Sequence, residues 1–486
     1  MFMMSSSEIS QAHNFSGRNK VGFYLLGLGA LLIYLAFLPP VIFDIDGNAM
    51  LAVSVSLLHG SVQVPTNDLG IRGRNGAVYC AWYPLQSFAA LPFVALGSAL
   101  AHLLRLPVHN LEAVCALLLA ALCTAGTVPL VSFLALQLGA DQPSAYLAGV
   151  VYGFGTIALV YARGFLADPL LALLTTSALC FAFQQRATPA AALCLFSVLA
   201  KPAGIVVGPV LSAYLFARTR KLCFSAIPAI GSALGLGLYA IYNAYRFGHP
   251  LTFGQPMAFA VRYIPKGLTG LLVSPGVGLL WFSPCAVCGL VGIFRAHKRW
   301  EAFTILGIFG SFLGLHSLWV EWHGGWSWGP RLILPALPGV VASIALLPNW
   351  AKKMTAALAL VTFLLTAPTM FSYYERYYAE ADQRGVPFSE IMWNPVASPL
   401  IHAWPVAFRE TREAIARAEV PLVADSPSIP WNEQSFRALK MVAIWWWLLP
   451  LAHVPRAFGA ALSLLLVIAG ATALNKASDW HLHGTP

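Results

Sequence analysis

Long apolar stretches, separated by short polar segments, run along nearly the whole of this chain. Most of them approach or exceed the roughly 17 residues that a helix needs to cross the hydrocarbon core of a bilayer. The stretches span residues 21–38, 111–138, 146–162, 169–183, 189–217, 222–242, 271–294, 303–319, 332–347, 354–371, 441–454 and 457–474. The pattern predicts an all-α polytopic membrane protein with about 11 to 13 transmembrane helices and further helices lying along one membrane face.

The composition agrees with this prediction. Of the 486 residues, 58% are hydrophobic and only 10% are charged, and the mean hydropathy is +0.71. A soluble domain cannot bury that much apolar surface. Most of the eight cysteines, including the Cys285/Cys288 pair, lie in apolar stretches, which indicates packing rather than disulfides or a zinc site.

The net charge of +10 would suggest a nucleic-acid partner in a soluble protein. Here the basic residues fall in short clusters between apolar stretches, which is the pattern that orients membrane helices, so no nucleic acid is expected. The clusters are Arg18/Lys20, Arg186, Arg218/Arg220/Lys221, Arg295/Lys298/Arg299, Lys352/Lys353 and Arg456. Placing all of them inside predicts that 189–217 crosses twice, with its turn at Lys201-Pro202, and that the C-terminus lies outside.

One apolar stretch, residues 85–104, breaks this parity if it crosses. Hydropathy alone favours a crossing, but a crossing would place every later basic cluster outside. We therefore expect an interfacial or re-entrant helix at the outer face, and Pro92 near its middle agrees with that.

The spacing divides the chain into three parts. Residues 1–371 form the transmembrane core, including an outer loop at 39–110. Residues 372–440 hold nine of the 19 acidic residues and predict an outer, periplasmic segment, in which 405–419 is expected to be a helix with an Arg409/Glu413 pair. Residues 441–486 predict a transmembrane hairpin and a tail.

The first candidate for chemistry is Phe43-Asp44-Ile45-Asp46-Gly47, directly after the first apolar stretch. Alternate residues of an extended segment share a face, so Asp44 and Asp46 could act together. Carboxylates at this boundary could take a proton from a hydroxyl or hold a divalent cation. The alternative is a helix cap or plain solvation.

The second candidate is Asp168, which lies in a short outer turn before Pro169. An acid near hydrocarbon is costly and is usually functional. Asp168 before proline equally suits an N-cap, which would explain it without chemistry. Arg163, in the same turn, could meet an anionic group or pair with Asp168.

The third candidate is the segment from Glu321 to Arg331, which is rich in glycine and tryptophan. Tryptophans alone would indicate an interfacial belt. Glu321, His323 and Arg331 in the same dozen residues favour a binding role, with Trp326 and Trp328 against a sugar or prenyl chain and Arg331 at a phosphate. His316 is expected to be a packed histidine.

Two further basic positions are candidates. Arg74 lies on an outer loop that leads through Tyr79 to Tyr83, and such loops bind lipid headgroups more often than a substrate. Lys201, at the Lys-Pro break, is either a phosphate contact or a side chain that extends to the membrane surface.

Taken in order, these residues resemble the GT-C class of glycosyltransferases, which use polyprenyl-phosphate sugars. The resemblance is strongest to bacterial proteins of the dolichyl-phosphate-mannose mannosyltransferase-like group, and it extends to protein O-mannosyltransferases and aminoarabinose transferases. It covers about residues 21 to 350. The matching positions are Asp46-Gly47, Ser56-Leu57-Leu58-His59-Gly60, Gly73-Arg74-Asn75-Gly76, Tyr79, Tyr83-Pro84, Leu91-Pro92-Phe93, Gly97, Tyr161-Ala162-Arg163, Asp168-Pro169, Asn243, Arg246-Phe247-Gly248, Ser274-Pro275-Gly276 and Gly325-Trp326-Ser327-Trp328-Gly329-Pro330-Arg331.

The resemblance implies a membrane enzyme that moves a sugar from a polyprenyl-phosphate donor to a hydroxyl of a lipid, glycan or protein, with inversion. It implies a bacterial inner membrane with the site facing the periplasm. Its first acid matches Asp46, or Asp44 if the register slips, and its second matches Asp168; a divalent cation on Asp46 and Asp168 stays open.

The chain departs from the family at Trp82, where relatives often carry a lysine. The resemblance then leaves the donor phosphate to Arg74, Lys201, Arg331 or Arg163, and the substrate to Tyr79, Tyr83, Glu321, His323, Trp326 and Trp328. The alternatives are a transporter or flippase and a non-catalytic binder of lipid-linked sugars. No inverted halves with helices broken at mid-membrane are evident, which speaks against a transporter.

Overall fold

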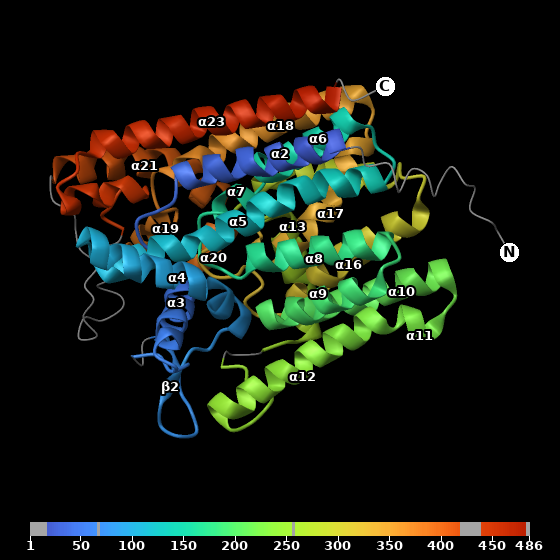
Figure 1. Ribbon diagram of the computed structural model, residues 1–486, viewed down its shortest axis with the longest axis horizontal. Coiled ribbons are helices and arrows are strands. Elements are labelled where there is room, and N and C mark those ends of the chain that lie inside the picture. The colour runs from blue at the N-terminus through green and yellow to red at the C-terminus, as the bar shows by residue number, and fades with distance from the viewer. Residues whose placement is uncertain (1–16, 66–68, 255–257, 418–438, 483–486) are drawn as a thin grey trace.

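The computed structural model describes residues 17–65, 69–254, 258–417 and 439–482. These parts are almost entirely helical (Figure 1). The α-helices of the first half are α2 Gly17–Ala36, α3 Ile45–Leu58, α4 Pro84–Leu104, α5 Val108–Gln137, α6 Gln142–Phe154, α7 Ala158–Tyr161, α8 Asp168–Phe183, α9 Ala187–Ala200, α10 Val207–Thr219, α11 Leu222–Ser225 and α12 Ile227–Phe247. Those of the second half are α13 Ile264–Val273, α14 Leu279–Phe282, α15 Pro284–Ile293, α16 Arg299–Ser317, α17 Leu337–Ala342, α18 Asn349–Thr366, α19 Glu375–Gln383, α20 Phe388–Trp393, α21 Pro399–Ala416 and α23 Arg456–Leu482.

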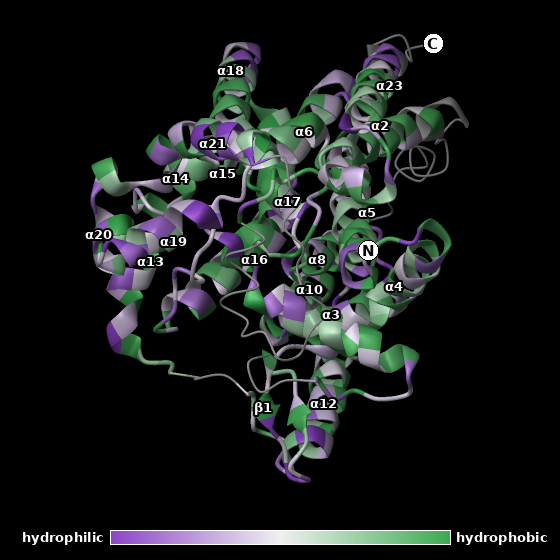
Figure 2. Cartoon of the chain, turned by 90° about the vertical axis from the view of Figure 1, so that its left-hand side faces the viewer, coloured by the Kyte–Doolittle hydropathy of each residue, from purple (hydrophilic) through white to green (hydrophobic). Residues whose placement is uncertain are grey.

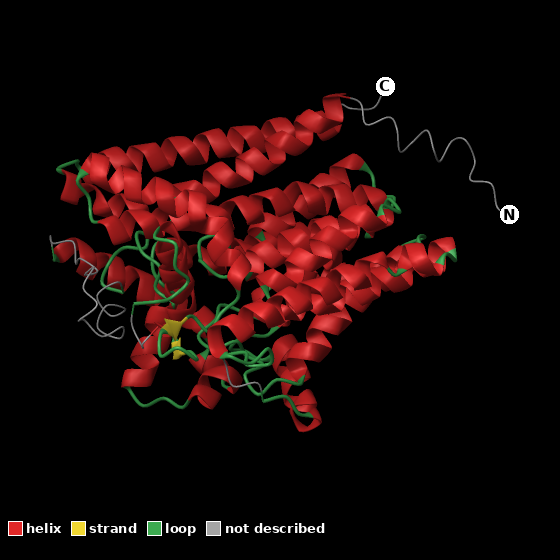
Figure 3. Ribbon diagram, turned by 60° about the horizontal axis from the view of Figure 1, so that its bottom comes forward, coloured by secondary structure: helices red, strands yellow, loops and turns green. Residues whose placement is uncertain are grey.

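Short 3-10 helices and one small sheet complete the described parts. The 3-10 helices are η2 Pro202–Val206, η3 Val261–Tyr263, η4 Arg331–Ala336, η5 Ser343–Leu346, η6 Ala367–Met370, η7 Pro395–Ala397 and η8 Trp445–Ala452. The strands β1 Ile71–Arg72 and β2 Val78–Tyr79 pair antiparallel. Figure 3 shows the two short strands among the loops, and Tyr79 of β2 packs on Tyr245 and Phe247 at the end of α12.

In the described parts of the chain, six helices are long and apolar enough to cross a membrane, and six shorter apolar helices accompany them. The long ones are Pro84–Leu104, Val108–Gln137, Pro202–Thr219, Ile227–Phe247, Asn349–Met370 and Arg456–Asp479. The predicted fold class, an all-α polytopic membrane protein, is confirmed. Helix α3 has only 14 residues and spans about 21 Å, too short for a hydrocarbon core of about 30 Å.

The bundle of helices has two opposite ends. At one end, here called the outer end, lie Asp46 of α3 and Asp168 of α8. At the other, the inner end, the Lys298 ammonium donates to the carbonyl of Gln137, and Lys352 donates to Ser144. Asp46 and Asp168 therefore lie at the end of the bundle opposite to Lys298 and Lys352, as the charge pattern predicts.

The predicted turn at Lys201-Pro202 is confirmed. Helix α9 ends at Ala200, the 3-10 helix η2 follows, and α10 begins at Val207. Proline cannot donate to the preceding turn, so the chain breaks there and reverses at the outer end. The single apolar stretch 189–217 is therefore two helices.

The C-terminal prediction needs correction. The stretch 441–454 was expected to cross, but it contains an eight-residue 3-10 helix, η8, about 16 Å long and too short to do so. Only α23 is long, so the expected hairpin has one long arm. Ser463 of α23 donates to the carbonyl of Ala36 at the outer end, and Gly470 lies against Gly29. Helix α23 thus runs antiparallel to α2 and ends at the inner end, not outside.

Helix α4 forms a tight hairpin with α5. Gly97 lies against the backbone of Leu111 and Glu112 with no room for a Cβ atom, and Ser98 donates to Glu112 at 2.5 Å. In Figure 1, α4 lies beside α5 and α3. Helix α4 is itself long and apolar enough to cross a membrane, so its placement at the outer face stays a prediction.

The acid-rich segment folds as helices α19, α20 and α21. Helix α21 begins at Pro399, six residues earlier than expected, because Ser398 caps it by accepting from the amide of Leu400. The expected Arg409/Glu413 pair does not form. Arg409 instead bonds Glu380 of α19 at 2.6 Å, and Glu413 bonds Arg417 at 3.0 Å.

We expect cysteines placed at Arg218 and Val396 to react with an impermeant maleimide from opposite sides of the membrane. Arg218 lies in the last turn of α10 at the inner end, and Val396 is 72% exposed beside α20 and α21. Labelling in intact spheroplasts and in inverted vesicles measures this. Cys223, the exposed native thiol, is replaced by serine first. Labelling of both positions from one side would contradict the orientation.

Candidate active site

Asp46 lies in the first turn of α3 and faces Arg331, which opens η4. The guanidinium of Arg331 donates to Oδ2 of Asp46 at 3.3 Å, and each side chain is only 17% exposed. The pKa of the Asp46 carboxyl is raised overall, because the effect of burial exceeds the opposing effect of the positive charge on Arg331. The two residues are 285 positions apart in sequence, so only the fold brings them together.

Asp168 is the first residue of α8 and pairs with Lys201. The Lys201 ammonium donates to Oδ1 of Asp168 at 2.7 Å, and the acid's side chain is 3% exposed. The N-cap position belongs to Ala167, and no side chain caps the helix. The capping interpretation of Asp168 is therefore wrong, and its partner is a cation from the α9–α10 turn.

Both ion pairs line one cavity of about 320 Å³, here called the main cavity. The charges of Lys201 and Asp168 also affect the pKa of Asp46. The two ion pairs therefore interact electrostatically with each other. The other walls are largely apolar or aromatic and consist of Met50, Trp82, Tyr83, Leu166, Ala167, Pro202, Ala203, Ile205, Leu236, Phe253, Phe259, Leu315, His316, Trp319 and Leu332. Two acids and two bases thus stand at the wall of an apolar space.

A second cavity, of about 410 Å³, adjoins the first. It shares Asp46, Arg331, Trp82 and Trp319 with the main cavity. Its remaining lining is Ile45, Ala49, Leu69, Gly70, Ile71, Ala81, Gly254, Glu321, Gly324 and Gly325. The Asp46–Arg331 pair therefore borders both spaces and can meet a group that enters from either side.

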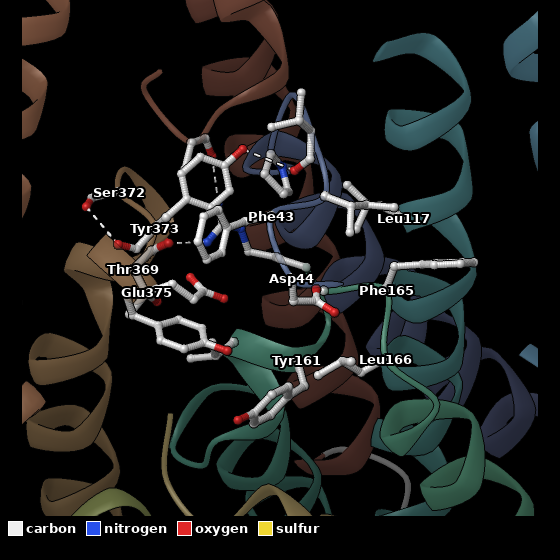
Figure 4. A pocket seen from close by; sticks show the side chains of 18 residues that line it. Phe43, Asp44, Leu117, Tyr161, Phe165, Leu166, Thr369, Ser372, Tyr373 and Glu375 are labelled. Carbon is white, nitrogen blue, oxygen red and sulfur yellow. Dashed lines mark hydrogen bonds between the residues drawn. The ribbon is translucent and has the colours of Figure 1, made fainter. Parts of the chain in front are cut away.

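Asp44 does not share the main cavity, contrary to the expectation that it acts with Asp46. It is the N-cap of α3 and accepts from the amide of Gly47 at 2.5 Å. Its side chain points into a small cavity of about 50 Å³, where Glu375 of α19 also points (Figure 4). Burial raises the pKa of Asp44 to about 6 and that of Glu375 to about 8. The cap interpretation therefore describes Asp44.

Replacing Glu375 by glutamine is expected to raise the melting temperature at pH 8 by several degrees and to change it little at pH 5. The pKa of Glu375 is raised in the folded state, so the native protein binds more protons than the unfolded chain between the ordinary pKa, about 4.3, and about 8. Stability therefore falls as the pH rises through that window, and glutamine removes the loss. Thermal unfolding in detergent at both pH values measures it; an equal shift at both would contradict the assignment.

Arg163 lies in the outer turn but does not reach Asp168. Its guanidinium is buried and donates to four backbone carbonyls, those of Phe37, Thr369, Met370 and Ala443. These carbonyls belong to three separate parts of the chain. The expected phosphate contact is therefore corrected, since Arg163 ties together the loops after α2, after α18 and before η8.

Arg163→Met is expected to destabilise the protein by about 3–5 kcal/mol, because four carbonyls lose their donor. Folded protein should keep its affinity for a donor lipid. Melting temperatures in detergent measure the first effect. Arg262→Met, at an exposed arginine on η3, is the matched control and should change stability by less than about 0.5 kcal/mol. A normal melting temperature for Arg163→Met would count against this role.

The Arg74–Tyr83 segment divides between the site and the scaffold. Arg74 is exposed on the β1–β2 turn and lines none of the cavities described above. Tyr79 is 2% exposed, packs on Tyr245 and Phe247, and accepts from Asn75 at 3.0 Å. Of the three predicted residues Arg74, Tyr79 and Tyr83, only Tyr83 lines the main cavity.

The Glu321–Arg331 segment also divides. Glu321 lines the second cavity and bonds His323 at 3.1 Å. Burial lowers the pKa of His323 to about 4, so this histidine is neutral at pH 7. Trp326 stacks on Tyr378, and Trp328 is 1% exposed against Phe282. Neither tryptophan lines the main or the second cavity, contrary to the expected sugar contacts.

The candidate metal ligands do not fit a divalent cation. Asp46 and Asp168 each bind a basic side chain already, and no group of three metal-ligating side chains occurs in the described parts of the chain. A cation would have to displace both Arg331 and Lys201 to gain two carboxylates. The positive charge of the site comes from the protein itself.

Three residues of this region were not expected from the sequence. His316 lines the main cavity, although it was expected only to pack, and its Nδ1 lies 2.8 Å from the carbonyl of Phe312. Trp82, noted only as a departure from the family, borders both large cavities. Glu375 was not singled out either, and the one feature of the sequence that could have indicated it is its position shortly after the apolar stretch 354–371.

Comparison with solved structures identifies the fold. ArnT from Cupriavidus metallidurans in the apo state is similar with a TM-score of 0.51 and 15% identity, over 93% of this chain and 77% of ArnT. ArnT bound to undecaprenyl phosphate gives 0.49 and 14%, over 97% and 79%. An apo oligosaccharyltransferase from Archaeoglobus fulgidus gives 0.43 and 11%, over 89% and 57%. No family model and no curated protein matches the sequence. The likeness to apo ArnT over nearly the whole chain shows that this protein has the GT-C fold of membrane glycosyltransferases.

Proposed function

We propose that this chain transfers a sugar from a polyprenyl-phosphate donor to an acceptor hydroxyl at the outer face of the membrane. The observation that carries the proposal is the pair of salt bridges, Asp46–Arg331 and Asp168–Lys201, at the wall of one apolar cavity. Such a cavity suits a ligand that is a lipid at one end and an anion at the other. ArnT, which shares the fold, has been solved with undecaprenyl phosphate bound.

The donor lies in the main cavity. Its prenyl chain meets the apolar walls, such as Leu236 and Phe253, and its phosphate meets Lys201 and Arg331. As the bond between the anomeric carbon and the phosphate oxygen breaks, negative charge grows on that oxygen. Fixed cations in a water-poor site stabilise it.

Asp46 acts as the general base. It borders both large cavities, so an acceptor hydroxyl entering from the second cavity reaches it while the donor occupies the main one. Asp46 takes the hydroxyl proton as the acceptor oxygen bonds to the anomeric carbon, and polyprenyl phosphate leaves. One such displacement inverts the anomeric centre. A pKa raised by burial makes this carboxylate a stronger base.

Asp168 is assigned a positioning role. It holds the Lys201 ammonium at 2.7 Å and keeps it at the cavity wall before the donor arrives. The phosphate then shares or replaces the carboxylate as partner of the ammonium. A preformed cation avoids the reorganisation that a free lysine would need.

The acceptor class remains a lipid, a glycan or a protein, and the transferred group a hexose or a pentose. We place the enzyme in a bacterial inner membrane with its site toward the periplasm, because the basic clusters lie at the opposite end of the bundle. The charged groups of the main cavity lie at one end of the helices, which favours transfer at a membrane surface over passage through the membrane.

Purified protein in nanodiscs, given a radiolabelled polyprenyl-phosphate sugar and a lipid A or glycan acceptor, tests the proposal. We expect acceptor-dependent release of polyprenyl phosphate and label on the acceptor. A flippase would instead move the intact donor between leaflets of a liposome. Donor movement without release would replace the proposed transferase with a transporter, and binding alone would leave only a lipid-sugar binder.

A further inference from the structure

Helix α21 exposes a narrow apolar stripe. At 100° per residue, Ile401, Trp404, Phe408 and Ile415 fall within about 60° of one another on the helix surface. Their exposed fractions are 57%, 36%, 69% and 61%. Soluble proteins seldom leave four large apolar side chains on one helix face exposed to water. This set of four residues is called the α21 stripe below.

The rest of α21 divides into two further sectors. Val406, Ala407 and Ala414 are buried and lie roughly opposite the stripe. Arg412, Arg409 and Glu413 lie between the two apolar sectors, and the exposed Arg412 is at the edge of the stripe. A helix with one apolar face on protein, one apolar face exposed and a charged sector between them suits the boundary of protein, lipid and water.

The position of α21 identifies what covers the stripe. The indole nitrogen of Trp404 donates to the carbonyl of Leu364 at 3.1 Å, in the last turns of α18. Helix α18 belongs to the candidate span Asn349–Met370, and Leu360, Val361 and Leu364 on it are more than half exposed. Figure 2 shows α21 next to α18, with both coloured as mixtures of apolar and polar residues. The stripe therefore continues the exposed apolar surface of a helix that is long and apolar enough to cross a membrane.

We propose that lipid of the outer leaflet covers the α21 stripe, so that α21 lies along the membrane surface with its charged sector in water. The tryptophan at the junction agrees, since tryptophan prefers the interface between headgroups and chains. The inference is independent of the transfer reaction, since it concerns which surface of the acid-rich segment meets the bilayer.

This contact would fix the outer segment relative to the membrane. Helix α21 is tied to α19 by Arg409–Glu380 at 2.6 Å and by Arg376–Glu410 at 3.1 Å. Helix α19 begins at Glu375, which points into the small cavity beside Asp44 (Figure 4). Lipid against the stripe therefore holds α19 at the depth where Glu375 meets the N-terminal cap of α3.

Nitroxide labels on single cysteines in full-length protein, reconstituted in phosphatidylcholine liposomes, test the proposal. The positions are 408 and 415 on the stripe, with 413 and 416 on the same helix as matched controls outside it. Cys223→Ser removes the exposed native thiol. Collision rates with oxygen, which concentrates in lipid, and with a water-soluble nickel chelate are measured by electron paramagnetic resonance. We expect the ratio of oxygen to nickel collisions to be several-fold higher at 408 and 415 than at 413 and 416.

Two outcomes would overturn the proposal. Equal ratios at all four positions, with free access of nickel, would place the stripe in water. Low access of both reagents at 408 and 415 would mean that protein covers it, either residues 418–438 of this chain or another molecule. Melting temperatures of the four labelled proteins, compared with the unlabelled parent, show whether each is folded, and only folded variants enter the comparison.

Discussion

Asp46→Asn is expected to lower the rate of sugar transfer by about 100- to 10,000-fold, the usual contribution of a general base. Asparagine has the size of aspartate and can still accept from Arg331, so the fold and the two cavities should remain. What is lost is the ability to take a proton. Initial rates at saturating donor, with release of polyprenyl phosphate as the readout, measure the effect.

Two matched variants give this prediction its specificity. Asp141→Asn changes an acid that caps α6 by accepting from the amide of Ser144, far from the cavity, and should leave the rate within about twofold. Asp44→Asn changes the cap of α3 and should cost less than Asp46→Asn, because Asp44 faces the small cavity. A larger loss for Asp44→Asn would transfer the role of base to that residue.

The pH dependence should separate the base from a structural acid. Activity of the wild type is expected to rise with pH as Asp46 loses its proton, and the midpoint should lie above the ordinary aspartate value of about 3.9 because burial raises the pKa. In Asp46→Asn the residual activity should lose this rise. An unchanged pH profile with a low rate would indicate that Asp46 only orients Arg331.

The sequence predicts the fold well where a single local signal decides the outcome. Proline after Lys201 ends α9, and apolar length identifies α5 and α23. The sequence predicts the fold poorly where the conformation of an apolar stretch depends on contacts with distant parts of the chain. The stretch 441–454 is apolar enough for a crossing, yet it folds as the short η8, and Trp445 donates its amide to the carbonyl of Leu38 near the outer end.

The site shows the same division. An acid beside hydrocarbon identifies Asp46 and Asp168 because charge there is costly. The same signal does not identify their partners, because the pairing of Asp168 with Lys201, 33 positions away, and of Asp46 with Arg331, 285 positions away, depends on the fold. Arg163 shows the reverse case, in which a conspicuous charge in an outer turn is satisfied by four carbonyls and carries structure only. Local spacing cannot distinguish a buried arginine that binds backbone from one that binds a phosphate.

Lys201→Met is expected to lower kcat/KM for the donor by about 100- to 1,000-fold, since a cation at the leaving phosphate is lost. The substitution also leaves Asp168 buried without its partner, which by itself could disturb the site. The double variant Lys201→Met/Asp168→Asn removes that stray charge. If Lys201 contacts the phosphate, the double variant regains stability but not activity. Recovery of activity would show that Lys201 serves only to neutralise Asp168. Lys298→Met, at the inner end, is the control and should transfer sugar normally.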